Sequence, residues 1–186
     1  VWDNLFLPRP LKQKTVSRYL FEHLYLAHLY FEDDGSNTIF FKIVRSKTPP
    51  GQPIERIATR RPYDDPKVAQ FYYRLWRDPS SVIEKTHMPY LLDSARKEKL
   101  TSWFYKTDYV VSTLPSYAPE KASNPFLTFE AIPPFIKHSF LLDEGQYTIM
   151  NFIKGSVCRG AIALSAIQDH FWVFFVAPDE MKTKDF

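Results

Sequence analysis

The sequence predicts an α+β fold with a mostly antiparallel sheet of hairpins and about three helices. Apolar segments typical of strands occur in pairs joined by short polar turns, which indicates hairpins. No alternation of strand and helix, which would indicate a parallel sheet, runs through the chain. At 186 residues, with 45% hydrophobic and 17% aromatic residues, the chain can build one substantial core. We therefore predict a single domain over residues 1–186.

The N-terminal part of the chain predicts a helix, a strand and a long loop. Thr15 or Ser17 can cap a helix over residues 16–31, which is aromatic on most sides. Residues 37–45 are rich in β-branched and aromatic side chains, as is typical of a strand. The proline-rich residues 46–66 predict a loop, and loops of this length inside a compact domain are often functional. One face of the predicted strand carries Ile39, Phe41 and Ile43.

The middle of the chain predicts a hairpin, a capped helix and further extended segments. Residues 69–76 and 81–86 predict the two strands of the hairpin. Asp93 or Ser94 can cap a helix over residues 93–106, which has a charged middle and an aromatic end. The other extended segments are residues 126–132 and 138–142, on either side of Pro133-Pro134.

The C-terminal block, residues 143–178, predicts a buried helix followed by an apolar hairpin. Asp143 and Gln146 have the spacing of a capping box, and Gly155 ends the helix. Two apolar strands, joined by Gln168-Asp169, complete the block. The polar exceptions gather in the turn after the helix, where we expect the rim of a pocket. They are Lys154, Cys158, Arg159 and Gly160.

Charge and motifs exclude several functional classes. Lys and Arg exceed Asp and Glu by 24 to 21, a balance that permits but does not compel binding to an anionic surface. The basic residues are dispersed, so we expect no nucleic-acid partner. No apolar run approaches the roughly 20 residues of a membrane-spanning helix. No phosphate-binding loop, dinucleotide fingerprint, zinc spacing or serine-hydrolase elbow occurs. Because the chain begins at Val1 without a methionine, we expect it to be a portion of a longer chain.

Several segments resemble the bacterial fatty acid cis/trans isomerases, and together they cover most of the chain. They are RPLKQKTVSRYLFEHLYLAHLYF, FFKIVRSKTPPGQPIERIATRRPYDDP, EKTHMPYLLD, ASNPFLTFEAIP and QYTIMNFIKGSVCRGAIAL through HFWVFFV. The resemblance implies a periplasmic enzyme with c-type haem. It implies that the enzyme converts cis double bonds in unsaturated fatty acyl chains of membrane lipids to trans, an adaptation to membrane stress.

The haem implied by the resemblance has no attachment motif in this sequence. Family members bind haem c covalently through C-x-x-C-H. Cys158 is the sole cysteine here and Arg159 follows it. We therefore expect the haem to be attached outside this chain, on a haem-bearing remainder, and this portion need not be active alone. The catalytic residues stay unassigned, and no metal-binding set is predicted.

The resemblance also implies a slot for the acyl chain with a polar mouth, and a surface in contact with haem. The candidate substrate-binding residues are Arg60, Arg61, Tyr147, Asn151, Lys154, Cys158 and Arg159. The candidate haem-contacting residues are His28 and His87. Each has a simpler alternative: solvated charge or an ion pair with Asp64 or Asp65 for the arginines, and ordinary core packing for the others. The alternative function is a non-catalytic lipid- or haem-contacting binding module.

Overall fold

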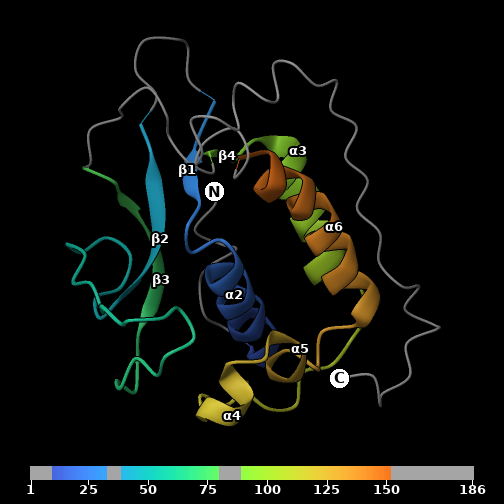
Figure 1. The fold of residues 1–186 in the computed structure, drawn as a ribbon. Helices are drawn as coiled ribbons and strands as arrows, with labels where there is room; N and C mark the ends of the chain where they lie inside the picture. Colours follow the sequence, from blue (N-terminus) through green and yellow to red (C-terminus); the bar gives the residue numbers. More distant parts are fainter. Residues whose placement is uncertain (1–9, 33–38, 80–88, 152–186) are drawn as a thin grey trace.

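The computed structural model describes residues 10–32, 39–79 and 89–151, with side chains to residue 145. It has the predicted α+β architecture, in which α2 lies between the sheet on one side and α3 and α6 on the other (Figure 1). The strands are β1 (His28–Tyr30), β2 (Phe41–Ser46), β3 (Tyr72–Arg77) and β4 (Pro89–Leu91). The helical elements are α2 (Leu11–His23), α3 (Ser94–Thr101), the π-helical turn η1 (Ser102–Lys106), α4 (Pro119–Ala122), α5 (Pro125–Thr128) and α6 (Pro134–Asn151).

The four described strands form one mixed sheet in the order β3-β2-β1-β4. The strands β2 and β3 pair antiparallel from Phe41 opposite Arg77 to Ser46 opposite Tyr72. The short strand β1 joins β2 antiparallel and β4 parallel. Two of the three pairings are therefore antiparallel, as predicted. Residues 81–86, predicted as the second strand of a hairpin with 69–76, lie outside the described residues, so this hairpin stays a prediction. The predicted C-terminal hairpin also lies outside them.

The core is built around α2. Val16, Tyr19 and Leu20 lie at i, i+3 and i+4, so they share one face of the helix, and all three are buried. The Tyr19 ring contacts those of Phe129 and Phe140, with centroid distances of 5.0 and 5.3 Å. Aromatic pairs of this kind each add about 1 kcal/mol beyond their burial. The aromatic cluster therefore joins α2 to the segment after α5 and to α6.

The first helix is shorter than predicted and begins earlier. It starts directly after Pro10, since proline suits a helix N-terminus, where its missing N–H costs nothing. Thr15 and Ser17, the predicted caps, are buried inside the helix. Residues 28–30, predicted as helix, form β1, because backbone pairing on both sides of this segment overrides its local preference.

The prediction that the two segments around Pro133-Pro134 are extended is wrong. Residues 138–142 lie in α6, and residues 126–132 form the end of α5 followed by turns. Asn124 caps α5 by accepting bonds from the Phe126 and Leu127 N–H groups at 3.0 and 3.4 Å. Pro134 is the first residue of α6, a position that proline favours. Asp143, the predicted cap, therefore lies inside α6, and the capping box does not form. Within the described residues, no helix combines the length and apolar character needed to cross a bilayer.

Candidate functional site

A buried arginine anchors the long loop, defined as residues 47–71 between β2 and β3. Arg45 lies on β2 and is only 1% exposed. Its Nη1 donates to the Asp64 carbonyl at 2.7 Å, its Nη2 donates to the Thr59 hydroxyl, and its guanidinium lies over the Phe21 ring. The Arg45 side chain therefore ties the long loop to the face of the sheet that packs on α2.

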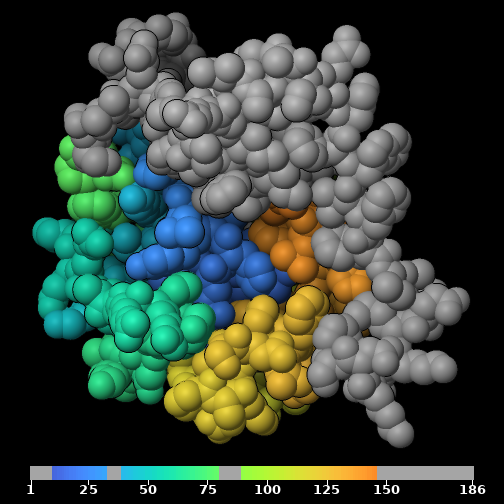
Figure 2. Space-filling view, viewed as in Figure 1, coloured from blue at the N-terminus to red at the C-terminus, as the bar shows by residue number. Residues whose placement is uncertain are grey.

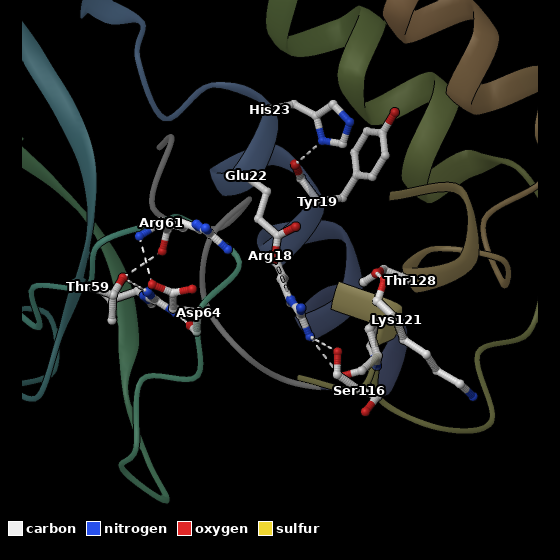
Figure 3. A network of polar contacts seen from close by, with 12 residues as sticks. Arg18, Tyr19, Glu22, His23, Thr59, Arg61, Asp64, Ser116, Lys121 and Thr128 are labelled. Atoms are coloured by element: carbon white, nitrogen blue, oxygen red, sulfur yellow. Dashed lines mark hydrogen bonds and ion pairs between the residues drawn. The ribbon is translucent and has the colours of Figure 1, made fainter. Parts of the chain in front are cut away.

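A second buried arginine projects from α2. Arg18 is 4% exposed, and its Nε donates to Glu22, one turn later, at 2.7 Å. Its Nη1 donates to the carbonyl oxygens of Pro115 and Ser116 at 2.8 and 3.1 Å, as Figure 3 shows for Ser116. The Tyr117 ring covers the guanidinium at 3.7 Å. The Arg18 side chain therefore holds the segment before α4 against α2.

Two pockets flank Tyr117. We call the first, of about 510 Å³, the α2 pocket, and the second, of about 550 Å³, the loop pocket. In Figure 2 the long loop (teal to green) and the α4–α5 segment (yellow) meet beside α2 (blue). The α2 pocket is lined by Lys14, Arg18, Ala69, Gln70, Phe71, Tyr72, Tyr73, Leu114, Pro115 and Tyr117. The loop pocket is lined by Ala58, Thr59, Arg60, Arg61, Tyr63, Asp64, Asp65, Pro66, Lys67, Tyr117, Pro119, Ala122 and Ser123.

We call Arg18, Arg45 and Glu22 the guanidinium cluster. Burial raises the pKa of Glu22, while Arg18 and then Arg45 oppose that rise. Burial likewise raises the pKa of Tyr73, helped by Tyr117. The cluster holds two cations and one carboxylate, so its buried charge is positive. Among the described residues, Nη2 of Arg18 and Nε of Arg45 have no hydrogen-bond partner.

A second charged cluster, the α6 cluster, joins α6 to β4 and α3. The Tyr90 hydroxyl and Nη1 of Arg96 donate to Oε1 of Glu144 at 2.6 and 2.7 Å. Lys99 donates to Asp143 at 2.7 Å, and Arg96 lies 3.6 Å from the same carboxylate. Burial raises the pKa of Glu144 to about 6. Two cations therefore face two carboxylates, and neither pocket is lined by a residue of this cluster.

Arg60 and Arg61 are the predicted site residues that the structure brings to a pocket. Both are exposed and line the loop pocket. The bond between Arg61 and Asp64 runs from the backbone N–H to the carboxylate, at 2.8 Å, so it orders the loop (Figure 3). Their role in substrate binding stays a prediction.

The other predicted site residues do not gather at these pockets in the described part of the chain. His28 lies in β1, not in the predicted helix, with Nε2 3.6 Å from Oδ2 of Asp78. Tyr147 and Asn151 lie within the backbone span of α6. The remaining candidates lie outside the described residues: His87, Lys154, Cys158 and Arg159.

The sequence analysis missed the guanidinium cluster, although the sequence carries a signal for each member. Arg45 continues the alternation of Phe41 and Ile43, so it belongs to the apolar face of its strand. Arg18 and Glu22 are spaced i, i+4 on an otherwise aromatic helix, which favours an ion pair. An arginine on a predicted core face is the signal that would have pointed to a buried cation.

The sequence matches the family described as fatty acid cis/trans isomerase (CTI) over residues 1–186. No curated protein and no solved structure matches the chain. The family description implies isomerase activity on fatty acids. Because the match extends over every residue, we conclude that this chain belongs to the fatty acid cis/trans isomerase family.

Proposed function

We propose that this chain is the acyl-binding portion of a haem-dependent enzyme that converts cis double bonds in unsaturated acyl chains of membrane lipids to trans. The enzyme would act in the periplasm, at the membrane surface. Membership of the isomerase family supports the reaction class. The observation that carries the binding role is the α2 pocket, which combines aromatic and aliphatic walls with two cations.

The α2 pocket has the composition that an acyl chain with an anionic end requires. Phe71, Leu114 and Pro115 offer apolar surface, and Tyr72 and Tyr73 add aromatic rings. Ligand pockets of a few hundred Å³ are commonly apolar, with a few polar groups that fix orientation. In this pocket the residues can exclude water from the chain and hold its polar end near α2.

The described residues do not fit a haem site. The sequence has no C-x-x-C-H motif, so covalent attachment within this chain is excluded. His23 is enclosed by Tyr19 and Phe140, and its Nδ1 contacts the Tyr19 carbonyl at 2.8 Å. Neither pocket is lined by a histidine. We therefore derive no step through haem from these residues and propose that a remainder of the protein carries it.

The binding role is tested by placing a charge on the apolar wall of the α2 pocket. Leu114 lines the pocket and is 48% exposed, so Leu114→Glu should fold. The full-length, haem-bearing protein is expressed in a bacterial periplasm, and trans-monounsaturated fatty acids are measured by gas chromatography. A carboxylate beside the acyl chain should lower the trans-to-cis ratio about tenfold, the effect of roughly 1.4 kcal/mol of lost binding.

Val110→Glu is the matched control. Val110 lies on the same connection but is 83% exposed and lines neither pocket, so this variant should keep the wild-type ratio. Equal ratios for the wild type and both variants would contradict acyl binding in the α2 pocket. A loss in both variants would point to a general effect of added negative charge.

A further inference from the structure

The guanidinium cluster carries an excess of buried positive charge. Arg18 and Arg45 are 4% and 1% exposed, and in the described part of the chain the carboxylate paired with Arg18 is that of Glu22, whose side chain is 8% exposed. Both arginines act on the pKa of Glu22 and of Tyr73, so the two cations share one neighbourhood. A buried charge without a counter-charge costs several kcal/mol. An anion bound there would remove part of this cost.

The donors that the fold leaves unused lie in the same cluster. Arginine offers five N–H groups in a fixed fork. Arg18 directs those on Nε and Nη1 to Glu22, Pro115 and Ser116. Nη2 of Arg18 has no partner among the described residues. Two N–H groups of a buried cation therefore have no acceptor in the described part of the chain.

The Tyr117 ring covers the guanidinium that carries these donors. It lies over the Arg18 guanidinium at 3.7 Å, and Tyr117 also lines both pockets. Arg18 itself lines the α2 pocket, beside the apolar surface of Phe71 and Leu114. Rotation of one aromatic side chain would expose the guanidinium to a ligand in this pocket.

We propose that Arg18 forms an oxyanion site on the floor of the α2 pocket, which binds the charged end of an acyl ligand after Tyr117 moves aside. This inference rests on the proposed function. The shared chemistry is a carboxylate or phosphate oxygen at the end of an acyl chain, which a guanidinium binds through charge-assisted hydrogen bonds. Arg45 and the exposed Lys14 add positive electrostatic potential around Arg18, and the negative charge of Glu22 offsets part of it.

The first test compares the binding of three ligands of equal chain length to the full-length protein by isothermal titration calorimetry, below their micelle concentrations. Oleate carries a carboxylate, oleoyl lysophosphatidylglycerol carries a phosphodiester, and oleyl alcohol carries no charge. At least one anionic ligand should bind tenfold or more tightly than the alcohol, since hydrogen bonds to charged groups dominate at such a site. The anionic ligand that shows this preference identifies the source of the oxyanion.

The second test changes the cluster. Arg18→Lys keeps the charge and the i, i+4 pairing with Glu22 but removes the fork, so the preference for the anionic ligand over oleyl alcohol should fall about tenfold. Arg77→Lys, on an exposed residue of β3 that lines neither pocket, is the matched control and should leave the preference unchanged.

Glu22→Gln provides a test of opposite sign, which also serves if Arg18→Lys does not fold. It keeps an oxygen for Nε of Arg18 but removes the buried negative charge, so the anionic ligand should bind several-fold more tightly. Binding of oleyl alcohol should not change.

The outcomes separate this inference from the proposed function. If oleate, the lysophospholipid and oleyl alcohol bind equally, and Arg18→Lys leaves them equal, the oxyanion site is wrong while acyl binding stands. If none of the three binds to the wild-type chain, both the site and the acyl-binding role are wrong.

Discussion

The guanidinium cluster and the α6 cluster are both largely buried groups of charges, but they differ in balance. In the α6 cluster, Arg96 and Lys99 donate to Glu144 and Asp143, each at 2.7 Å, and Arg96 also lies 3.6 Å from Asp143. The guanidinium cluster has two arginines for one buried carboxylate and leaves donors without partners in the described residues. It also lies beside two pockets, which the α6 cluster does not line.

This difference separates a structural role from a binding role. A balanced, fully bonded cluster holds elements together, and removal of one partner exposes the cost of a lone buried charge. An unbalanced cluster beside a pocket retains capacity for a ligand of opposite charge. The comparison therefore predicts that changes in the α6 cluster alter stability, whereas changes in the guanidinium cluster alter anion binding.

The largest effect is expected for Arg96→Met. It leaves Glu144 buried with only the Tyr90 hydroxyl, so the free energy of unfolding at pH 7.5 should fall by about 3 kcal/mol. Chemical denaturation followed by circular dichroism measures this. Lys99→Met is the control, because Lys99 is partly exposed and its pair with Asp143 is worth less than about 1 kcal/mol. Equal costs for the two variants would show that the α6 cluster is not a buried structural unit.

The pH dependence of stability gives the next effect. The pKa of Glu144 is raised from an ordinary 4.5 to about 6, because burial outweighs the opposing contributions of Tyr90 and Arg96. Folded protein therefore binds this proton more tightly than the unfolded chain does, and stability falls as pH rises from 4.5 to 6. The remaining charges that face Glu144 are Asp143, which raises its pKa, and Lys99, which lowers it.

The magnitude of this fall is about 2 kcal/mol, since one pKa unit corresponds to about 1.4 kcal/mol. Denaturation of the wild type and Glu144→Gln across this pH range isolates the contribution of Glu144. The glutamine variant should lack this component of the fall. If the difference in free energy of unfolding between the wild type and Glu144→Gln stays constant with pH, the pKa of Glu144 is not raised.

The sequence predicts those parts of the fold that depend on local signals. The cap of α3 is one, since Asp93 accepts a bond from the Arg96 N–H at 2.7 Å as its position before a helix indicates. The strand β1 is not, because three residues carry little preference and become a strand through pairing with β2 and β4. The start of α6 was missed because Pro133-Pro134 was interpreted as a break, although proline also begins helices.

The residues of the candidate site show the same difference between local signals and contacts that form only in the fold. Arg60 and Arg61 were predicted because a proline-rich loop with paired arginines is a local feature, and both line the loop pocket. Arg18 and Arg45 were missed because arginine is ordinarily exposed. Their burial depends on Ser116 and Asp64, which lie far along the chain and meet them only in the folded protein.

The smallest effect separates two tyrosines, Tyr19 and Tyr90, that both lie close enough to Glu144 to be affected by its charge. Tyr90 donates to Glu144, and Tyr90→Phe should cost about 1.5 kcal/mol because a hydrogen bond to a charged group is lost. The Tyr19 hydroxyl is also buried, and Glu144 contributes to its raised pKa, but it has no hydrogen-bond partner among the described residues. Tyr19→Phe should therefore change the free energy of unfolding by less than about 0.5 kcal/mol, or stabilise the protein.

The pair of phenylalanine variants tests where the α6 cluster ends. Both substitutions remove one hydroxyl and keep the ring, so packing within the core is nearly unchanged and the comparison isolates the hydrogen bond. Equal costs in thermal or chemical denaturation would mean that Tyr19 also bonds to the cluster. In that case α2 would carry both clusters, and a change at one could reach the other through a single helix. A cost confined to Tyr90 would instead show that the hydrogen bonds of the α6 cluster end at β4 and do not extend to α2.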